Sequence, residues 1–225
     1  RRILARYPDH QILGEESSAG TIAATAIQSH RPLWILDPID GTTNFIHGIP
    51  AFAISIAFLD NGQPRNGAIY DPLRDELFTS ERNAGLWLNG ERRNCSNCGS
   101  FERALIASAM PFRFPEVLAD ALPVFAAVQR ACDDQRRSGS CALDIANVAV
   151  GRLDAYHELG IHPWDTAAGE LLVRSGGGVA TDYRGSTEDV VHRRSVVCAA
   201  SAALHGRLLE LVAPLRPWLD RPPFA

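Results

Sequence analysis

The first hundred residues are dominated by short apolar runs separated by turn residues. Asp60-Asn61-Gly62, Asp71-Pro72 and Asn89-Gly90 punctuate these runs, a pattern typical of strands joined in an antiparallel meander. Residues 1–7 have the pattern of the end of an amphipathic helix, and residues 17–29 predict a loop because they show no clear period. The predicted strands cover residues 33–36, 52–59, 67–70, 76–79 and 86–88.

Beyond about residue 100 the pattern changes to strands that alternate with helical periods. This alternation predicts an α/β arrangement. The predicted strands cover residues 104–108, 153–159 and 196–200, and the predicted helices cover residues 117–132, 142–150, 165–174 and 202–215. The first of these helices carries apolar residues at helical spacing, namely Leu118, Leu122, Phe125 and Val128.

Two glycine- or proline-rich stretches mark breaks in the second half. Gly176-Gly177-Gly178 fits a helix C-cap that leads into a strand, because it lacks the frame of a nucleotide-binding loop. The Pro-rich residues 216–225 predict a loose tail.

Composition and charge narrow the class of protein. The chain of 225 residues is 46% hydrophobic and 21% charged, the balance of a soluble globular protein. Its net charge of −4 gives no basic field, so no nucleic-acid partner is indicated. No apolar run approaches the ~18 residues that span a bilayer, and no signal-peptide pattern occurs. We therefore expect no membrane association and a cytoplasmic location.

The five cysteines favour a reducing compartment, since their number is odd and the chain can build an ordinary core. Cys95 and Cys98 have CxxC spacing. A zinc site would need a second close pair, which Cys132 and Cys141 do not supply. A thioredoxin-like motif would begin a helix, whereas this pair follows the Asn89-Gly90 turn. We interpret them as ordinary thiols in or near a loop.

The stretch from Asp37 to Phe45 carries the most distinctive chemistry. It follows the run 33–36, which predicts a short buried strand that ends at the first carboxylate. Asp40 comes three positions later, and Gly41-Thr42-Thr43-Asn44 favours a helix start or tight turn with free N–H groups. Two acids beside such N–H groups fit divalent cations placed between the acids and a phosphate. A plain Pro-containing turn is the alternative.

Three motifs resemble the inositol monophosphatase family, the Mg²⁺-dependent and lithium-sensitive phosphatases. They are Gly14-Glu15-Glu16-Ser17, the stretch from Asp37 to Thr42, and Trp164-Asp165-Thr166-Ala167-Ala168-Gly169, in the family's order and at roughly its spacing. The resemblance implies a mixed α+β and α/β fold, a layered α-β-α-β-α sandwich of the sugar-phosphatase type. Residues 1–100 would form a metal- and phosphate-binding α+β half, and residues 101–225 an α/β half that completes the cleft.

The resemblance also implies how a metal site would be built. Two or three Mg²⁺ ions would be bound, with Mn²⁺ as a possible substitute and Li⁺ as an inhibitor. Glu15 and Thr42 would position the attacking water, and Asp40 would serve both catalysis and metal binding. The implied metal ligands are Glu15, Asp37, the carbonyl of Ile39, Asp40 and Asp165.

A small phosphorylated substrate would lie against the metal site. Backbone N–H groups of Gly41 and Thr42 would hold its phosphate oxygens. Glu158 would contact a substrate hydroxyl. The remaining implied substrate contacts are Asp40, Ser140, Cys141 and Asp165.

Simpler interpretations compete at several positions. Asp165 could serve only as the N-cap of its helix, and Glu158 could be a surface residue of a strand. Glu16 is best read as a solvated acid. The remaining polar residues near the motifs are given structural roles: packing or hydrogen bonding for His47 and His162, and a solvated charge pair for Arg136-Arg137.

The branch of the family is indicated by Thr43-Asn44-Phe45 with His47, and residues 104–113 resemble the bacterial form. The implied substrate is inositol 1-phosphate or a similar small polyol phosphate, and the implied assembly is a homodimer. Related phosphatases of fructose 1,6-bisphosphate, 3′-phosphoadenosine 5′-phosphate or histidinol phosphate stay open, as does a non-catalytic regulator on the same scaffold. The family pattern includes two helices ahead of residue 1, with an aspartate that bonds to Thr42. Because the sequence begins with Arg1 and no methionine, we expect its natural start to lie upstream.

Overall fold

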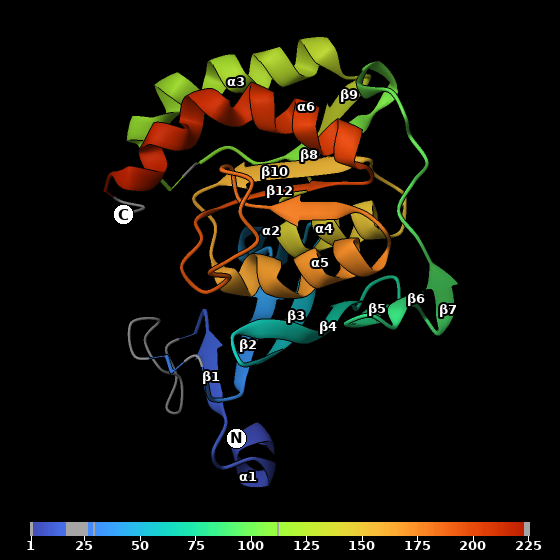
Figure 1. Cartoon of the computed structure of the whole chain (residues 1–225), viewed down its shortest axis with the longest axis vertical. Helices are drawn as coiled ribbons and strands as arrows, with labels where there is room; N and C mark the ends of the chain where they lie inside the picture. Colours follow the sequence, from blue (N-terminus) through green and yellow to red (C-terminus); the bar gives the residue numbers. More distant parts are fainter. Residues whose placement is uncertain (1, 17–26, 29, 112, 223–225) are drawn as a thin grey trace.

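Two β-sheets with a pair of helices between them form the frame of the computed structural model (Figure 1). The structure describes residues 2–16, 27–28, 30–111 and 113–222, so most of the predicted loop 17–29 lies outside the described residues. A second pair of helices, α3 and α6, covers the outer face of the second sheet (Figure 1). The described chain thus supplies the β-α-β-α layers of the predicted sandwich, and the predicted mixed α/β fold is confirmed.

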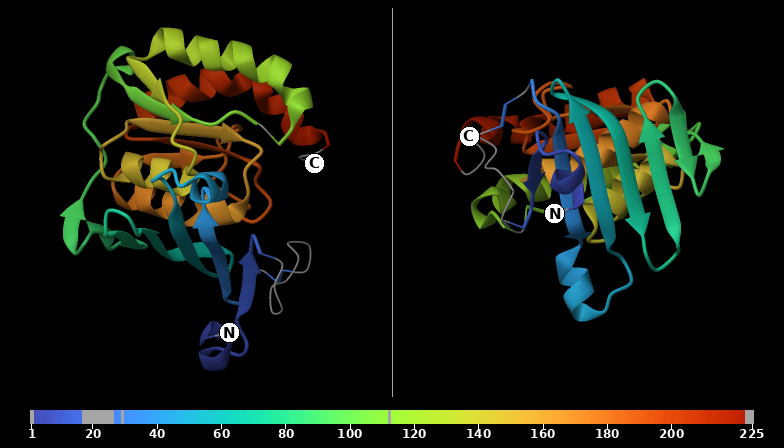
Figure 2. Two further views of the ribbon diagram at one scale, coloured as in Figure 1. Left: turned by 180° about the vertical axis from the view of Figure 1, so that it is seen from behind. Right: turned by 90° about the horizontal axis from the view of Figure 1, so that it is seen from below.

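The first sheet is the predicted meander, extended by one parallel strand. Strand β1 pairs with β2 in parallel, and every later neighbour is antiparallel, as the view from below shows (Figure 2). Strands β1 and β7 had no prediction. In sheet order the strands are β1 (Gln11–Gly14), β2 (Leu33–Asp40), β3 (Ala53–Asp60), β4 (Gln63–Asp71), β5 (Glu76–Glu81), β6 (Gly85–Leu88) and β7 (Glu91–Arg93).

The second sheet is mixed. Strand β8 runs parallel to both β9 and β10, whereas β12 is antiparallel to β10 and β11. Strands β9 and β11 were not predicted, because three residues are too few to show a period. In sheet order the strands are β11 (Val179–Thr181), β12 (Ser195–Ala199), β10 (Ala155–Leu159), β8 (Leu105–Ser108) and β9 (Asp134–Arg136).

The helices lie close to their predicted positions. Helices α4 and α5 pack tightly between the sheets: a Cβ on Gly169 would come within 2.6 Å of Ile145 Cγ2, so only glycine fits this crossing. The α-helices are α1 (Arg2–Arg6), α2 (Thr42–His47), α3 (Leu118–Ala131), α4 (Cys141–Ala149), α5 (Pro163–Ser175) and α6 (Ala202–Val212), and the 3₁₀ helices are η2 (Phe101–Arg103), η3 (Pro115–Val117) and η4 (Ala213–Asp220).

Helix α3 buries a different stripe from the one that its largest side chains suggest. Leu118 and Leu122 are 40% and 51% exposed, whereas Ala121, Val124 and Val128 are buried against the molecule. The two stripes are offset by one residue around the helix, and both have helical spacing. Small residues face inward because α3 lies close to α6 and η4.

The predicted loose tail is wrong for residues 216–220. These residues continue the 3₁₀ helix η4, whose Leu215 is 3% exposed. The Arg216 guanidinium donates to the carbonyl of Tyr183 at 2.7 Å, and the Trp218 indole donates to Asp120 at 2.9 Å. The two prolines of η4 are compatible with a short 3₁₀ helix, which the sequence pattern alone does not distinguish from a coil.

The cysteines and the triglycine have the predicted structural roles. The buried Cys95 thiol donates weakly to the carbonyl of Val173 at 3.6 Å, and burial raises its pKa to about 11. The Cys98 thiol donates to the carbonyl of Ser100. Gly176 caps α5, and the chain then enters β11.

Candidate active site

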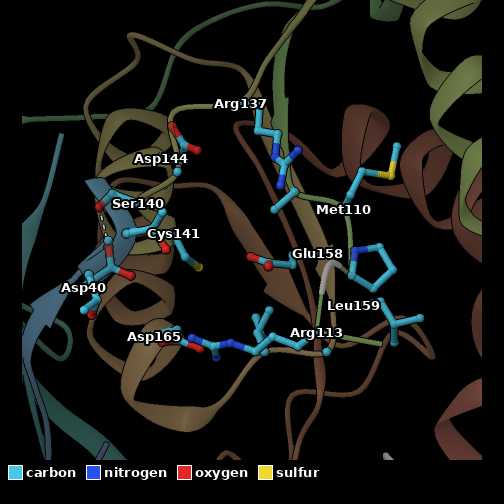
Figure 3. Close-up of a pocket in the computed structure, with 18 of the residues that line it drawn as sticks. Asp40, Met110, Arg113, Arg137, Ser140, Cys141, Asp144, Glu158, Leu159 and Asp165 are labelled. Atoms are coloured by element: carbon cyan, nitrogen blue, oxygen red, sulfur yellow. Dashed lines mark hydrogen bonds between the residues drawn. The ribbon is translucent and has the colours of Figure 1, made fainter. Parts of the chain in front are cut away.

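A pocket of about 110 Å³ lies where the β2–α2 segment meets the loops of the second sheet (Figure 3). The parallel strands β8 and β10 both direct their C-terminal ends to this edge, the usual position of ligand sites in α/β sheets. Ile39 is absent from the residues that line the pocket. The predicted site residues that do line it are Glu15, Asp37, Asp40, Gly41, Thr42, Ser140, Cys141, Glu158 and Asp165.

A β-bulge brings Asp37 and Asp40 to the same side of the first sheet. Residues three positions apart point to opposite faces of a regular strand. Here Asp37 pairs with Ser55 but Asp40 pairs with Ala53, so β2 contains one extra residue between them. Both aspartates are consequently buried, at 1% and 6% exposure.

This geometry corrects the predicted end of the strand at Leu36, because β2 continues through Pro38 to Asp40. Proline is tolerated within a strand at a bulge, where a ladder hydrogen bond is already missing. The Ile39 N–H donates to Asp37 Oδ1 at 2.9 Å and fixes that carboxylate.

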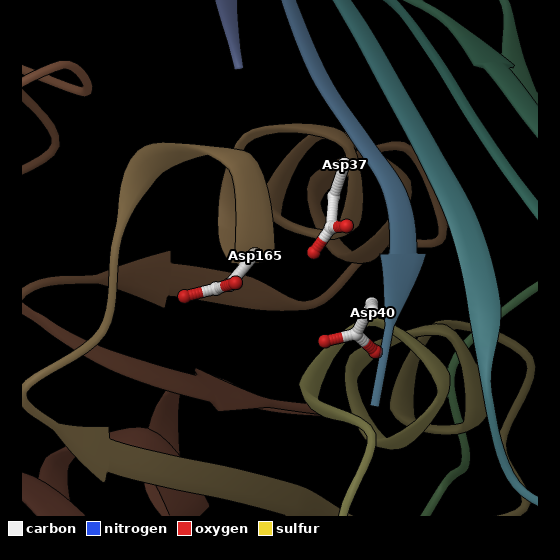
Figure 4. A group of neighbouring side chains, drawn as sticks. All are labelled: Asp37, Asp40 and Asp165. Carbon is white, nitrogen blue, oxygen red and sulfur yellow. The ribbon is translucent and has the colours of Figure 1, made fainter. Parts of the chain in front are cut away.

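A hydrogen bond between the sheet and α5 places Asp165 beside these acids. Ser55, the strand partner of Asp37, donates its hydroxyl to the carbonyl of Trp164 at 3.1 Å. Asp165 follows directly and accepts the N–H of His162 at 2.8 Å, so it completes a capping box as the third residue of α5, whose N-cap is His162. Its carboxylate nevertheless faces Asp37 and Asp40 (Figure 4). Capping and the predicted metal role are therefore compatible.

The three aspartates form a compact acidic group, in which Asp37 and Asp40 are buried and Asp165 is half-buried (Figure 4). One carboxylate oxygen from each lies within 4.8 Å of the others. Burial and the neighbouring acids Asp40 and Glu15 raise the pKa of Asp37 to about 7. Burial, followed by the charge of Asp40, raises the pKa of Asp165 well above its usual range.

The start of α4 supports Asp40. The Ser140 hydroxyl and the Ala142 N–H, at 3.0 Å, both donate to Asp40 Oδ2. Burial raises the pKa of Asp40 to about 6, and these two donors oppose that rise. The Asn44 side chain, in α2, holds the turn that precedes α4 by donating to the carbonyl of Ser138 at 2.9 Å. Cys141 begins the helix, and burial raises the pKa of its thiol well above the usual value.

Glu15 and Glu158 reach the pocket from the two sheets. Because β1 runs parallel to β2, Glu15 emerges beside Leu36 and its N–H approaches the Leu36 carbonyl at 3.4 Å. Its carboxylate lies 3.9 Å from the Arg113 guanidinium. Glu158 lies near the end of β10 and accepts the Tyr156 hydroxyl. Burial raises the pKa of Glu158 to about 7. The residue is half-buried and lines the pocket rather than an open surface of the strand.

The turn into α2 places Thr42 at the pocket. Gly41 has a φ of +85°, and a Cβ there would lie 2.9 Å from the Ala51 carbonyl oxygen, so the turn requires glycine. The Thr42 hydroxyl donates to the Ile39 carbonyl at 2.9 Å. That oxygen retains a second lone pair, so its predicted part in metal binding stays a prediction.

Three further charged residues line the pocket and received no site role from the sequence, namely Arg113, Arg137 and Asp144. Asp144 lies one helical turn after Ser140, and burial raises its pKa to about 7. That spacing was the available signal. Arg113 falls in the stretch that resembles the bacterial form, without an assigned role. Arg137 was interpreted as part of a solvated pair, but it points into the pocket (Figure 3).

The two histidines near the motifs do not line the pocket. His162 stacks on Trp164 with ring centroids 4.5 Å apart, as expected for a packing residue. Burial, with nearby arginines, lowers its pKa to about 4. His47 is exposed at the end of α2 rather than packed.

The chemistry of the acidic group fits hard divalent cations. The carboxylates of the three aspartates face one another. The Arg113 side chain points toward Asp165 across the pocket (Figure 3). Carboxylate oxygens are the ligands that Mg²⁺ prefers, and buried charges require a counter-charge. These three residues could hold such an ion, with Glu15 at the edge of the group.

Comparison with known proteins identifies the family of the chain. The model of the inositol monophosphatase family matches residues 1–216. The chain belongs to this family. Its fold resembles the inositol monophosphatase of Anabaena sp. PCC 7120 with a TM-score of 0.83 and 36% identity, over 96% of this chain and 84% of that structure. The family is metal-dependent and binds small phosphorylated substrates, and this chain has its phosphatase scaffold.

Similar curated proteins carry a different kind of name. Nus factor SuhB of Escherichia coli K12 is 42% identical over 179 residues, 80% of this chain and 65% of that protein. Nus factor SuhB of Pseudomonas aeruginosa PAO1 is 40% identical over 96% of this chain and 79% of that protein. The chain therefore spans less than two thirds of the length of the E. coli relative. No helix of the described residues has the length and apolar character needed to cross a bilayer.

Proposed function

We propose that the chain carries the active site of a metal-dependent phosphomonoesterase that hydrolyses inositol 1-phosphate or a similar small polyol phosphate. The observation that carries the proposal is the group formed by the buried Asp37 and Asp40 and the half-buried Asp165, whose carboxylates converge from two distant segments of the chain. A fold with no use for divalent cations would not gain from such an arrangement, because each ionised acid costs free energy in a buried site.

The residues around the acids suggest separate roles in cation binding and in orienting the acids. Asp37, Asp40, Asp165 and Glu15 would hold the cations, and Ser140 and Ala142 fix the orientation of Asp40. When bound, the cations would lower the pKa of the attacking water and neutralise charge on the phosphate and the leaving oxygen.

The substrate would be oriented by the remaining pocket residues. Thr42, at the turn into α2, would orient the attacking water together with Glu15. The N–H groups of Gly41 and Thr42 would donate to phosphate oxygens. Glu158, whose carboxylate is already held by Tyr156, would accept a hydroxyl of the polyol. Cys141 would contribute a neutral wall of the pocket, since its thiol stays protonated.

The test is Mg²⁺-dependent release of phosphate from inositol 1-phosphate, with fructose 1,6-bisphosphate, 3′-phosphoadenosine 5′-phosphate and histidinol phosphate as a comparison panel. Asp40→Asn should lower turnover by about a thousandfold, since a lost metal ligand removes several kcal/mol of transition-state stabilisation. Asp133→Asn, at an exposed position outside the pocket, should leave turnover unchanged. Full activity of Asp40→Asn would refute the metal assignment.

A second candidate is a non-catalytic regulator on the phosphatase scaffold. The observation that favours it is the name Nus factor, which the similar SuhB proteins carry instead of an enzyme name. The complete set of acids argues against it, because a protein released from catalysis would be free to lose them. Absence of turnover on the whole panel by a chain that still binds Mg²⁺ would favour the regulator. Inhibition by lithium and a homodimeric state stay predictions of the family resemblance.

A further inference from the structure

Arg137 lies at the mouth of the pocket on the segment that joins β9 to α4. Its side chain points into the pocket between Asp144 and Met110 (Figure 3). Within the described part of the chain, its guanidinium forms no hydrogen bond or ion pair. The side chain is exposed, so solvent rather than a protein group meets its charge.

The neighbouring arginines are neutralised by carboxylates. A second cavity, of about 560 Å³, shares Arg137 and Asp144 with the pocket and is lined by three further arginines. Each of those three is paired with an acid: Arg74 with Asp71 at 2.7 Å, Arg152 with Glu76 at 2.5 Å, and Arg136 with Asp134. Arg137 is thus the arginine with an uncompensated charge at the junction of the two cavities.

The position of Arg137 suits a ligand that extends beyond the acidic group. Arg137 follows β9, at the edge of the second sheet, whereas Asp37 and Asp40 belong to the first sheet. If the reacting phosphate lay beside Asp37 and Asp40, Arg137 would face the part of the alcohol that is farthest from that phosphate. A guanidinium presents a planar set of donors that matches phosphate and carboxylate oxygens in a bidentate manner.

We propose that Arg137 binds a second anionic group of the substrate, a phosphate or carboxylate on the alcohol portion. It would thereby select bis-anionic substrates over simple monophosphates. The inference rests on the proposed phosphatase function, but it concerns a different part of the ligand. Its consequence is that, among small polyol phosphates, those with a second anionic group on the alcohol portion bind more tightly than inositol 1-phosphate, with the adjoining 560 Å³ cavity available for that group.

The experiment compares fructose 1,6-bisphosphate with fructose 1-phosphate, which share the reacting end and differ in the second phosphate. Arg137→Ala should lower the ratio of kcat/KM for the bisphosphate to that for the monophosphate about tenfold or more, the usual effect of losing a hydrogen bond to a charged group. The change should lie mainly in KM. Arg137→Lys should restore part of the ratio, since it keeps the charge but not the bidentate geometry.

The control is Arg130→Ala, which removes the same charge from an exposed position on α3 that lines neither cavity. Its ratio should equal that of the wild type. An unchanged ratio in Arg137→Ala would overturn the proposal. An equal loss for both sugars would also overturn it, because Arg137 would then bind the reacting phosphate.

A binding measurement separates this inference from the proposed function. Calorimetric titration of the two sugar phosphates, without turnover, should show that Arg137→Ala weakens only the bisphosphate. Loss of turnover on every substrate with this binding difference intact would refute the phosphatase proposal and leave the role of Arg137 standing. Turnover of fructose 1-phosphate with no difference in binding would support the phosphatase proposal and refute the role of Arg137.

Discussion

Two sets of buried carboxylates in this chain have opposite surroundings. Glu170, in the middle of α5, is 1% exposed and accepts Arg174 and Arg193, each at 2.8 Å. Asp165, five residues earlier in the same helix, is also largely buried but faces two other acids. The fold supplies counter-charge where an acid serves stability. In the pocket the aspartates face one another instead, and we infer that cations from solution supply their counter-charge.

The strongest way to test this comparison is to neutralise one acid of each set. Glu170→Gln should cost roughly 3–5 kcal/mol of unfolding free energy, because it leaves the buried Arg193 and the half-buried Arg174 without their shared acid. Asp165→Asn should be neutral or stabilising in Mg²⁺-free buffer, because it removes repulsion while asparagine can still accept the His162 N–H. Urea denaturation of both variants measures the difference. Equal destabilisation by the two substitutions would contradict the comparison.

The second effect is a pH dependence of stability that Mg²⁺ removes. The folded-state pKa of Asp37 is raised to about 7 and that of Asp40 to about 6, above unfolded values near ~4. The folded chain therefore binds protons that the unfolded chain has released. The metal-free chain should lose stability as the pH rises from about 4 to about 7.

Thermal unfolding with and without Mg²⁺ at pH 5 and pH 8 measures this effect. At pH 8, Mg²⁺ at a hundred times its Kd should add about 2.7 kcal/mol, whereas at pH 5 protons already neutralise the acids and the gain should be small. A Mg²⁺ effect of equal size at both pH values would show that the raised carboxyl groups are not its binding site.

The smallest effect concerns the serine that supports Asp40. Ser140→Ala removes a donor that lowers the pKa of Asp40, so Mg²⁺ affinity at pH 7 should fall by up to about tenfold, the value of one hydrogen bond to a charged group. Ser201→Ala is the matched control, since both serines cap a helix by accepting an N–H three residues later at 3.3 Å. Both variants should lose about 1 kcal/mol of stability. Only Ser140→Ala should change the Mg²⁺ titration.

The sequence predicted the acids better than the backbone that positions them. The motifs around Asp37, Asp40 and Asp165 identified a set that the structure does bring together. The bulge in β2 was not predicted, because Pro38 in an apolar run normally indicates the end of a strand. The bulge depends on pairing with β3, which is a long-range interaction.

Other differences have the same origin. Leu118 and Leu122 share the spacing of the buried stripe of α3, so only the position of α6 decides which face is covered. Arg137 was interpreted as a solvated side chain because it is one of two adjacent arginines. The direction in which its side chain points depends on the path of the chain from β9 to α4. Residues 216–220 are held by contacts that no local pattern contains, among them those to Tyr183, Asp120 and Arg184.

The central claim is that Asp37, Asp40 and Asp165 together hold a divalent cation. Isothermal titration calorimetry of Mg²⁺ into the wild-type chain and the Asp165→Asn variant tests it most directly. A pH of about 7.5 lies above the raised pKa values of Asp37, about 7, and Asp40, about 6. The account predicts saturable binding to the wild type and a marked loss of affinity in the variant, with both chains folded. Identical isotherms for the two chains would contradict it.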